Sequence, residues 1–367
     1  MSILITGVSG VLGQNLFPYL LNKGYKDFIL TDISDYDIEP FKKLSKANVQ
    51  FFKGDIRDKK FIKKIVNKNI DIIIHTAAAS PTFSDDIVYS TIINGTKLLL
   101  EEAYKEKIKR FIYLSSTSVY GIPKKVPVFE TNKPEPFDAY NKSKIKAEEL
   151  CHEYRKKGMC IPILRPRTFI GPGRLGSFVI LFEWAMEGRD FPMIGKGTNR
   201  YQFLDVDDLS QAVYLCMIKP EMKVNDTFNI GAKDFKTMKE DYQSVLNVAG
   251  FGRKIINFPA KPALMILSIL AVFKLSPLYK RLYDKLNRHY FVSISKAEKI
   301  LGYKPKYSNE QALARNYQWF LQYYLNIKNT EGKGNNVPWK QGALKYAKIF
   351  FQKGKQIKGV KAYANKN

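Results

Sequence analysis

Two side chains in the middle of the chain could together exchange a proton with an alcohol. Tyr140 and Lys144 lie four residues apart in a segment of helical periodicity that Asp138 can cap, so we expect both on one helical face. A free tyrosine loses its proton at about pH 10 and is a poor base at neutral pH unless positive charge stabilises the phenolate. The Lys144 ammonium could supply that charge. The pair therefore predicts acid–base chemistry at a hydroxyl group.

Hydroxyl side chains follow the β-rich segment 110–115. The run Ser115-Ser-Thr-Ser-Val-Tyr-Gly121 places several of them at the end of a predicted strand. Ligands of parallel α/β sheets bind outside the carboxyl ends of the strands. We therefore expect this run to lie close to any reacting group.

Three glycines directly after an apolar strand predict a dinucleotide site at the N-terminus. Gly7 would permit a tight turn, Gly10 the close approach of a pyrophosphate, and Gly13 the packing of the next helix against the sheet. The helix N-terminus would then face the anion. A second strand ends at Asp32, where an acid fits a ribose diol. The residues of the turn that we expect at the cofactor are Gly7, Ser9, Gly10, Val11, Leu12 and Gly13.

The segments between these motifs predict an α/β fold. Short apolar runs alternate with amphipathic helical stretches, a pattern typical of a doubly wound (Rossmann) parallel sheet. The predicted strands after Asp32 include 49–52, 70–75, 110–115 and 160–165. We assign residues 1–170 to a nucleotide-binding domain with later contributions from about 201–235, residues 171–325 to a smaller C-terminal substrate-binding portion, and 326–367 to a basic tail.

Composition favours an enzyme of the cell interior. The 367 residues, 45% of them hydrophobic, can bury a large core. The cysteines at 151, 160 and 216 are isolated, so neither a metal site nor a disulfide framework is predicted. No signal peptide is visible before the first strand, and we expect a cytoplasmic location.

The formal net charge of +26 raises the question of an anionic partner. Most lysines lie at exposed helix positions, and nucleic acid binding is disfavoured. The tail is different, because no acidic residue follows Glu331 while lysines continue to Lys366. That asymmetry is compatible with an anionic surface.

The motifs together resemble the extended short-chain dehydrogenase/reductase family, also called the NAD-dependent epimerase/dehydratase family. The resemblance covers roughly residues 1–325. It is carried by Gly7-x-x-Gly10-x-x-Gly13, Gly54-Asp-Ile-Arg-Asp58, His75-Thr-Ala-Ala78, Asn94-Gly-Thr96, the run 115–121, Tyr140-x-x-x-Lys144, Arg165-Pro166, Gly171-Pro-Gly173, Phe203-Leu-Asp-Val-Asp-Asp208, Phe228-Asn-Ile-Gly231 and Leu301-Gly-Tyr-Lys-Pro305.

The resemblance implies a role for each matching residue. Tyr140 would be the acid/base that exchanges a proton while a hydride moves to or from nicotinamide, Lys144 would tune it, and Ser116 would hold the same hydroxyl. His75 is interpreted as a packed residue rather than a catalyst. The further residues implied at the cofactor are Asp55 and Ile56 at the adenine, Ala77 and Ala78 towards the nicotinamide, Asn94 at the neighbouring backbone, and Tyr140 and Lys144 themselves. Asp32 favours NAD, with NADP kept as the alternative because of Arg57.

The choice among family members rests on departures from its patterns. A 4,6-dehydratase is disfavoured because Thr117-Ser118 replaces the Asp-Glu pair of those enzymes, and neither hydroxyl titrates near neutral pH. Nucleotide-sugar epimerases carry asparagine at the position of Thr168 and arginine at the position of Tyr201. The nearby Arg200 is one residue out of register with that family arginine. A nucleotide-sugar epimerase that recycles its cofactor remains the favoured function, and a dehydrogenase that releases reduced cofactor is the alternative.

A lipid-alcohol substrate is the rival within the family. The apolar insert 262–273 is too short to span a bilayer, which takes about 20 residues, but it could lie on one, and 344–351 on the basic tail has a similar character. A 3β-hydroxysteroid-dehydrogenase-like enzyme at a membrane surface would use the same Ser116, Tyr140 and Lys144. A non-catalytic NAD(P) sensor is a more distant alternative. The family further implies a homodimer.

Overall fold

The computed structural model describes residues 1–39, 46–272, 288–327 and Phe351. The chain forms two compact units. Unit 1 comprises Met1–Phe169, Val206–Gly231 and Val292–Lys306, and unit 2 comprises Ile170–Asp205, Ala232–Phe291 and Tyr307–Asn367. Segment 292–306, which lies within the stretch that we expected to bind substrate, thus belongs to unit 1. The assignment of cofactor and substrate to separate portions stays a prediction.

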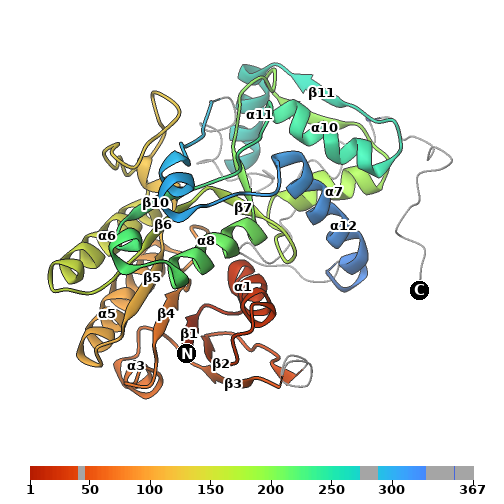
Figure 1. The fold of residues 1–367 in the computed structure, drawn as a ribbon. Helices are drawn as coiled ribbons and strands as arrows, with labels where there is room; N and C mark the ends of the chain where they lie inside the picture. The colour runs from red at the N-terminus through yellow and green to blue at the C-terminus, as the bar shows by residue number, and fades with distance from the viewer. Residues whose placement is uncertain (40–45, 273–287, 328–350, 352–367) are drawn as a thin grey trace. The chain divides into compact units, whose positions relative to one another are not determined.

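Unit 1 is built on a seven-stranded sheet with the order β10-β6-β5-β4-β1-β2-β3 (Figure 1). The strands are β1 Ser2–Thr6, β2 Asp27–Asp32, β3 Asn48–Lys53, β4 Ile72–His75, β5 Arg110–Leu114, β6 Ile163–Pro166 and β10 Thr227–Ile230. Every neighbouring pair is parallel. The strand order reverses between β1 and β4. In a doubly wound sheet, ligands bind outside the carboxyl ends of the strands at this point. The predicted Rossmann architecture is confirmed.

Helices cover both faces of this sheet. On one face α1 packs against α8, and on the other α5 packs against α3 and α6 (Figure 1). The helical segments of unit 1 are α1 Val11–Asn22, α3 Lys59–Ile65, α4 Asp85–Tyr89, the π-helix η1 Ser90–Asn94, α5 Gly95–Lys105, the 3-10 helix η2 Thr117–Tyr120, α6 Ala139–Lys156, α8 Val206–Ile218, α9 Glu221–Val224 and the π-helix η4 Ala297–Leu301. Ile3, Leu4 and Ile5 are fully buried, as expected of a strand covered on both faces.

Unit 2 has its own core. Its elements are α7 Phe178–Met186, β8 Phe191–Ile194, β9 Phe203–Asp205, α10 Met238–Ala249, β11 Ile255–Phe258, α11 Ala260–Val272 and α12 Asn309–Ile327, while the short β7 Thr168–Ile170 leads into it. Strands β8 and β11 pair in parallel. Large side chains from α7 and α12, among them Phe182, Tyr317 and Phe320, fill the core.

The apolar insert forms most of α11. Met265 on that helix is 62% exposed. Among the described residues, we find no helix with the length and hydropathy needed to traverse a bilayer. Phe273 and the expected apolar side of the tail, except Phe351, lie outside the described residues. Phe351 packs against Trp184, with ring centroids 4.9 Å apart.

Candidate functional site

The glycine turn after β1 combines tight packing with one open position. Gly7 has φ +79°, and a Cβ there would lie 2.6 Å from the backbone nitrogen of Ala77. A Cβ on Gly13 would lie 2.5 Å from the Cα of Val8. At Gly10, by contrast, a Cβ would meet only the Gly7 carbonyl oxygen among the described residues, at 3.2 Å. Gly7 and Gly13 are thus required by packing, and Gly10 leaves room for a close approach from outside.

The N-terminus of α1 is open to an anion. Its N-cap residue Gly10 has no side chain to cap the helix, and the first turn contains no acidic residue. The first amide groups of a helix lack intrahelical partners and carry a partial positive charge. The turn 7–13 therefore fits a pyrophosphate group. Ser9 lies in this turn, Val11 and Leu12 begin α1, and their contacts with a cofactor stay predictions.

Asp32 is held beside the same turn. Its Oδ2 accepts a hydrogen bond from the Ser9 amide at 2.9 Å, and its Oδ1 accepts one from the Ser34 amide at 3.0 Å. These two bonds fix a half-buried carboxylate at the carboxyl end of β2. A fixed acceptor at this place suits a ribose diol and would repel a 2′-phosphate.

Arg57 is engaged by Asp55 instead of standing free for a phosphate. Its Nε lies 2.9 Å from Asp55 Oδ2, and its Nη1 donates to Ser90 Oγ at 3.1 Å. The side-chain hydrogen bond with Arg57 holds the pKa of the Asp55 carboxyl below its ordinary value. Next to it, Ile56 is buried beneath Gly95, where a Cβ would lie 2.6 Å from Ile56 Cδ1.

The other predicted cofactor residues occupy loop and helix ends of unit 1. Ala77 and Ala78 follow β4 after Thr76, and Ala78 is exposed. Asn94 is the last residue of η1 and is also exposed. Their contacts with a cofactor stay predictions.

Lys144 is buried at the carboxyl end of β5. Helix α6 begins where predicted, because the Asp138 side chain accepts a hydrogen bond from the Asn141 amide at 2.8 Å. Lys144 is 3% exposed, and its Nζ donates to the Leu114 carbonyl oxygen at 2.6 Å. Burial lowers the pKa of Lys144 to about 8, although the charge of Glu148 opposes this effect. Tyr140, one turn earlier, is half-buried against the unit 1 core.

Ser116 is the N-cap residue of the short helix η2, which contacts α6. Its Oγ accepts a hydrogen bond from the Ser118 amide at 3.1 Å, so the hydroxyl is fixed while its own proton stays available for donation. The neighbouring Thr117 hydroxyl donates to the Pro166 carbonyl at 3.2 Å and accepts from Arg167. Thr117 is thus engaged in packing, whereas Ser116 lies half-buried at the strand end.

His75 is a neutral structural residue. It is 1% exposed, and its two ring nitrogens lie 2.7 Å from Thr6 Oγ1 and 3.0 Å from Thr96 Oγ1. Burial, followed by the charge of Lys144, lowers the pKa of His75 to about 3. A group with this pKa is uncharged at neutral pH and is too weak a base to take up a second ring proton there, in line with the packing role expected for it.

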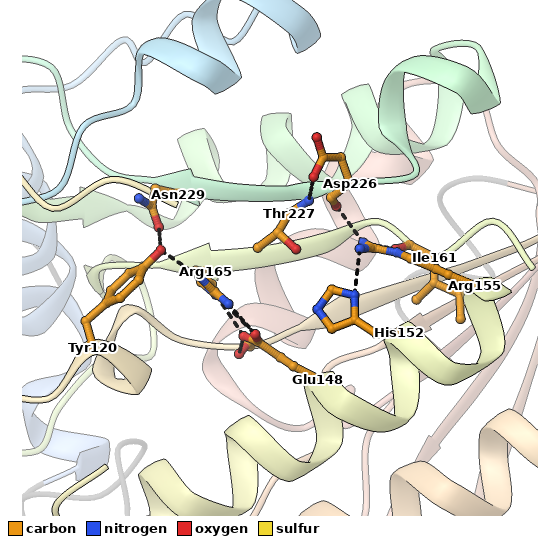
Figure 2. A network of polar contacts seen from close by, with 10 residues as sticks. Tyr120, Glu148, His152, Arg155, Ile161, Arg165, Asp226, Thr227 and Asn229 are labelled. Atoms are coloured by element: carbon orange, nitrogen blue, oxygen red, sulfur yellow. Dashed lines mark hydrogen bonds and ion pairs between the residues drawn. The ribbon is translucent and has the colours of Figure 1, made fainter. Parts of the chain in front are cut away.

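One buried feature was not foreseen from the sequence. Glu148, on α6, forms an ion pair with Arg165 of β6, and Tyr120 and Asn229 extend the network (Figure 2). The spacing of Glu148, four residues after Lys144, was a visible signal for a third polar position on the same helical face. In unit 2, the guanidinium carbon of Arg200 lies over the rings of Phe235 and Phe291, 4.7 and 5.4 Å from their centroids, and the two rings also contact each other.

The sequence pattern of the "NAD dependent epimerase/dehydratase family" matches residues 3–231. The chain belongs to this family. Membership confirms both the resemblance and NAD as the cofactor class. A similar chain, "Uncharacterized protein y4nG" of Sinorhizobium fredii, is 35% identical over 343 residues, which are 93% of this chain and 84% of that protein.

Other members of the NAD dependent epimerase/dehydratase family carry descriptions of activity. "Probable UDP-arabinose 4-epimerase 3" of Oryza sativa is 28% identical and aligns with 71% of this chain and 72% of its own length. The solved structure of a UDP-glucuronic acid 4-epimerase from Bacillus cereus in complex with NAD has a TM-score of 0.70, 25% identity, and coverage of 89% and 98% of the two chains. A Thermotoga maritima UDP-glucose 4-epimerase, at 24% identity and TM-score 0.72, covers 88% of this chain and 100% of its own and shares the fold.

Proposed function

We propose that this protein oxidises and re-reduces a secondary alcohol of a nucleotide sugar with NAD, and that the net reaction is epimerisation. The observation that carries the proposal is the buried Lys144, whose Nζ is fixed 2.6 Å from the Leu114 carbonyl, one helical turn after Tyr140. A buried ammonium beside a phenol is costly for folding and useful for acid–base chemistry.

Each residue of the set has one task. Tyr140 accepts the proton of the substrate hydroxyl. At the same time the carbon–hydrogen bond at the carbon that bears this hydroxyl breaks, and a carbon–oxygen double bond forms. The bound NAD supplies the acceptor for the departing hydride. Lys144 stabilises the Tyr140 phenolate before the proton arrives, and Ser116 donates a hydrogen bond to the substrate oxygen. In the return step Tyr140 gives the proton back to the carbonyl oxygen, and the hydride taken up by NAD would return to the opposite face of the carbonyl carbon, so that an alcohol of inverted configuration results.

The proposed cofactor is NAD in preference to NADP. Asp32 presents a carboxylate whose two oxygens are already oriented by backbone amides. The guanidinium of Arg57, the cation that could have accommodated a 2′-phosphate, is bound to Asp55. Both features favour a free ribose diol.

Epimerisation is favoured over dehydration by the residues beside Ser116. Loss of water needs a general acid, and Thr117 hydrogen bonds with Pro166 and Arg167 and has no titratable group near neutral pH. The nucleotide-sugar class is supported by the descriptions of the relatives. Arg200 hydrogen bonds with the Phe235 carbonyl at 3.1 Å, so we assign no diphosphate contact to it.

A ligand panel tests this function. UDP-, dTDP- and GDP-sugars, sterols and long-chain alcohols are each added to the full chain with NAD, and the unfolding temperature is measured. A ligand at 100 times its Kd adds about 2.7 kcal/mol to the unfolding free energy. We expect a nucleotide sugar alone to stabilise the protein and then to yield its epimer without accumulation of reduced cofactor. Stabilisation by lipid alcohols alone would make the protein a lipid-alcohol dehydrogenase.

We further propose that β11 and α11 contact a membrane surface. Ile256, Phe258 and Met265 are exposed apolar side chains in these elements, and Lys254 and Lys261 are exposed cations beside them. Apolar residues combined with lysines are typical of interfacial contacts with anionic lipid.

Flotation with vesicles measures this contact. The full chain should float with vesicles containing anionic lipid, and Phe258→Ser with Met265→Ser should reduce the bound fraction several-fold. Met222→Ser is the control, because Met222 is an exposed methionine of unit 1. Equal flotation of all three proteins, or none of the wild type, would contradict the proposed contact.

A further inference from the structure

A buried ion pair joins helix α6 to strand β6. The side chains of Glu148 and Arg165 are 4% and 7% exposed, and Arg165 Nε lies 2.9 Å from Glu148 Oε1 (Figure 2). Taking two charges out of water has a high free-energy cost, which the mutual attraction of the pair offsets only when further hydrogen bonds complete the site. The presence of such a pair therefore does not show that it stabilises the fold. The other groups that hydrogen bond with the pair indicate which part of the structure it orients.

Those partners flank the turn that carries Ser116. Ser115 Oγ donates a hydrogen bond to Glu148 Oε1, and Arg165 Nη1 donates one to the Tyr120 hydroxyl at 2.7 Å. The Tyr120 hydroxyl in turn donates to Asn229 Oδ1 at 2.8 Å. Residues 115 and 120 stand immediately before and at the end of the segment 116–120, so the two charges hold both of its ends.

Glu148 also belongs to the helix that carries the proposed acid–base pair. Tyr140, Lys144 and Glu148 follow one another at intervals of four residues, which places them along one face of α6. The ion pair therefore connects this helix with the Ser116 turn through buried, charge-assisted hydrogen bonds.

We propose that Glu148 and Arg165 are positioning residues that hold Ser116 in register with Tyr140. The proposal rests on the catalytic set given under Proposed function. It assigns no contact with substrate to either residue: their effect on catalysis passes through the turn 116–120 and through α6. A displacement of about 1 Å in such a set can reduce the rate by about 100-fold.

Replacing the whole pair separates positioning from stability. Removal of one partner would leave the other charge buried and unpaired, whereas replacement of both by apolar residues of similar size is often neutral for folding. Glu148→Met combined with Arg165→Met is therefore the test variant. Arg155→Met is the matched control, because Arg155 is on the same helix and binds the main-chain carbonyls of Ile161 and Asp226 (Figure 2).

Hydrogen exchange reports on the turn without any substrate. The amides of Ser118, Val119 and Gly121 donate within the turn to Ser116 Oγ, the Ser116 carbonyl and the Ser118 carbonyl. In the double variant we expect these three amides to exchange at least tenfold faster than in the wild type, while Arg155→Met leaves their rates unchanged. Wild-type exchange rates in the folded double variant would overturn the proposal.

Turnover supplies the second measurement. We expect the double variant to lose at least tenfold in kcat with an unchanged Kd for NAD, and Arg155→Met to retain its kcat. A wild-type kcat in the double variant contradicts the positioning role. If the wild type turns over none of the nucleotide sugars, the proposed function fails, while hydrogen exchange still decides the role of the pair. Should the double variant not fold, Tyr120→Phe removes one hydrogen bond of Arg165, and unchanged exchange at Gly121 would then overturn the proposal.

Discussion

Replacing Tyr140 with phenylalanine should reduce kcat by about 1,000-fold, within the range that positioned acid–base groups contribute. The variant keeps the aromatic ring that packs against the unit 1 core and loses only the hydroxyl that exchanges the proton. The cofactor turn 7–13, Asp32 and the helix N-terminus of α1 are unaffected. Binding of NAD should therefore persist with a Kd within about twofold of the wild type.

The measurement compares kcat and the Kd for NAD in the wild type, Tyr140→Phe and Tyr154→Phe. Tyr154 lies on the same helix, and its ring packs against Tyr104 with centroids 5.7 Å apart. Tyr154→Phe should keep the wild-type kcat. A Tyr140→Phe protein with full activity would show that another group moves the proton, and equal behaviour of all three proteins in a functional assay without turnover would favour an NAD(P) sensor.

The fold was accessible from the sequence because its determinants are local. Apolar strands such as Ile3–Ile5 are buried on both faces, and Asp138 caps α6 where its spacing indicated. The backbone at Gly7 has a positive φ, and a glycine directly after a predicted strand indicates such a conformation. Segment 292–306 could not be assigned in this way, since it joins unit 1 through long-range contacts. One example is the Val292 backbone, which forms a bridge with Val128.

The candidate site was accessible only in part, for the same physical reason. Spacing along one helix predicted Tyr140 and Lys144. The partners of Arg200 and Arg165 are set by tertiary packing, and no local pattern specifies them, whereas the partner of Arg57 is Asp55, two residues earlier in the same turn. The sequence kept NADP as an alternative because of Arg57 and assigned no partner to Arg200 or Arg165, whereas in the structure each of these three guanidinium groups is engaged with protein groups.

Replacing Lys144 with methionine should lower kcat/KM at neutral pH by about 100-fold. A nearby cation lowers the pKa of a phenol by about one to three units. When the cation is removed, each unit by which the phenol pKa rises reduces the phenolate fraction at pH 7 tenfold. Methionine fills a similar volume but cannot hydrogen bond the Leu114 carbonyl as Lys144 Nζ does. Lys146→Met is the control, because Lys146 is an exposed lysine of the same helix that pairs with Glu149. A Lys144→Met protein with wild-type kcat/KM would contradict the tuning role.

The same substitution should make the fold more stable. Burial lowers the pKa of Lys144 to about 8 from an ordinary value of 10.5, so the unfolded chain binds this proton more tightly than the folded protein does. Below about pH 8 the folded state therefore bears the full cost of the buried charge, and this cost is relieved as the pH rises from 8 towards 10.5. Its size is at most about 3 kcal/mol. Chemical denaturation at pH 7 should show Lys144→Met gaining part of this free energy.

The pH dependence of kcat/KM tests whether the loss of activity and the gain of stability in Lys144→Met both come from the proton on Lys144. As the pH rises through about 8, Lys144 in the free enzyme loses the charge that supports the Tyr140 phenolate, so kcat/KM of the wild type should fall on that side. In Lys144→Met the fall should be absent, and kcat/KM should continue to rise towards about pH 10, where an unassisted tyrosine ionises. A declining limb near pH 8 that survives in the variant would assign that titration to another group. A buried charge that serves catalysis destabilises the fold. Its removal should therefore lower the activity and raise the stability, as we expect for Lys144→Met.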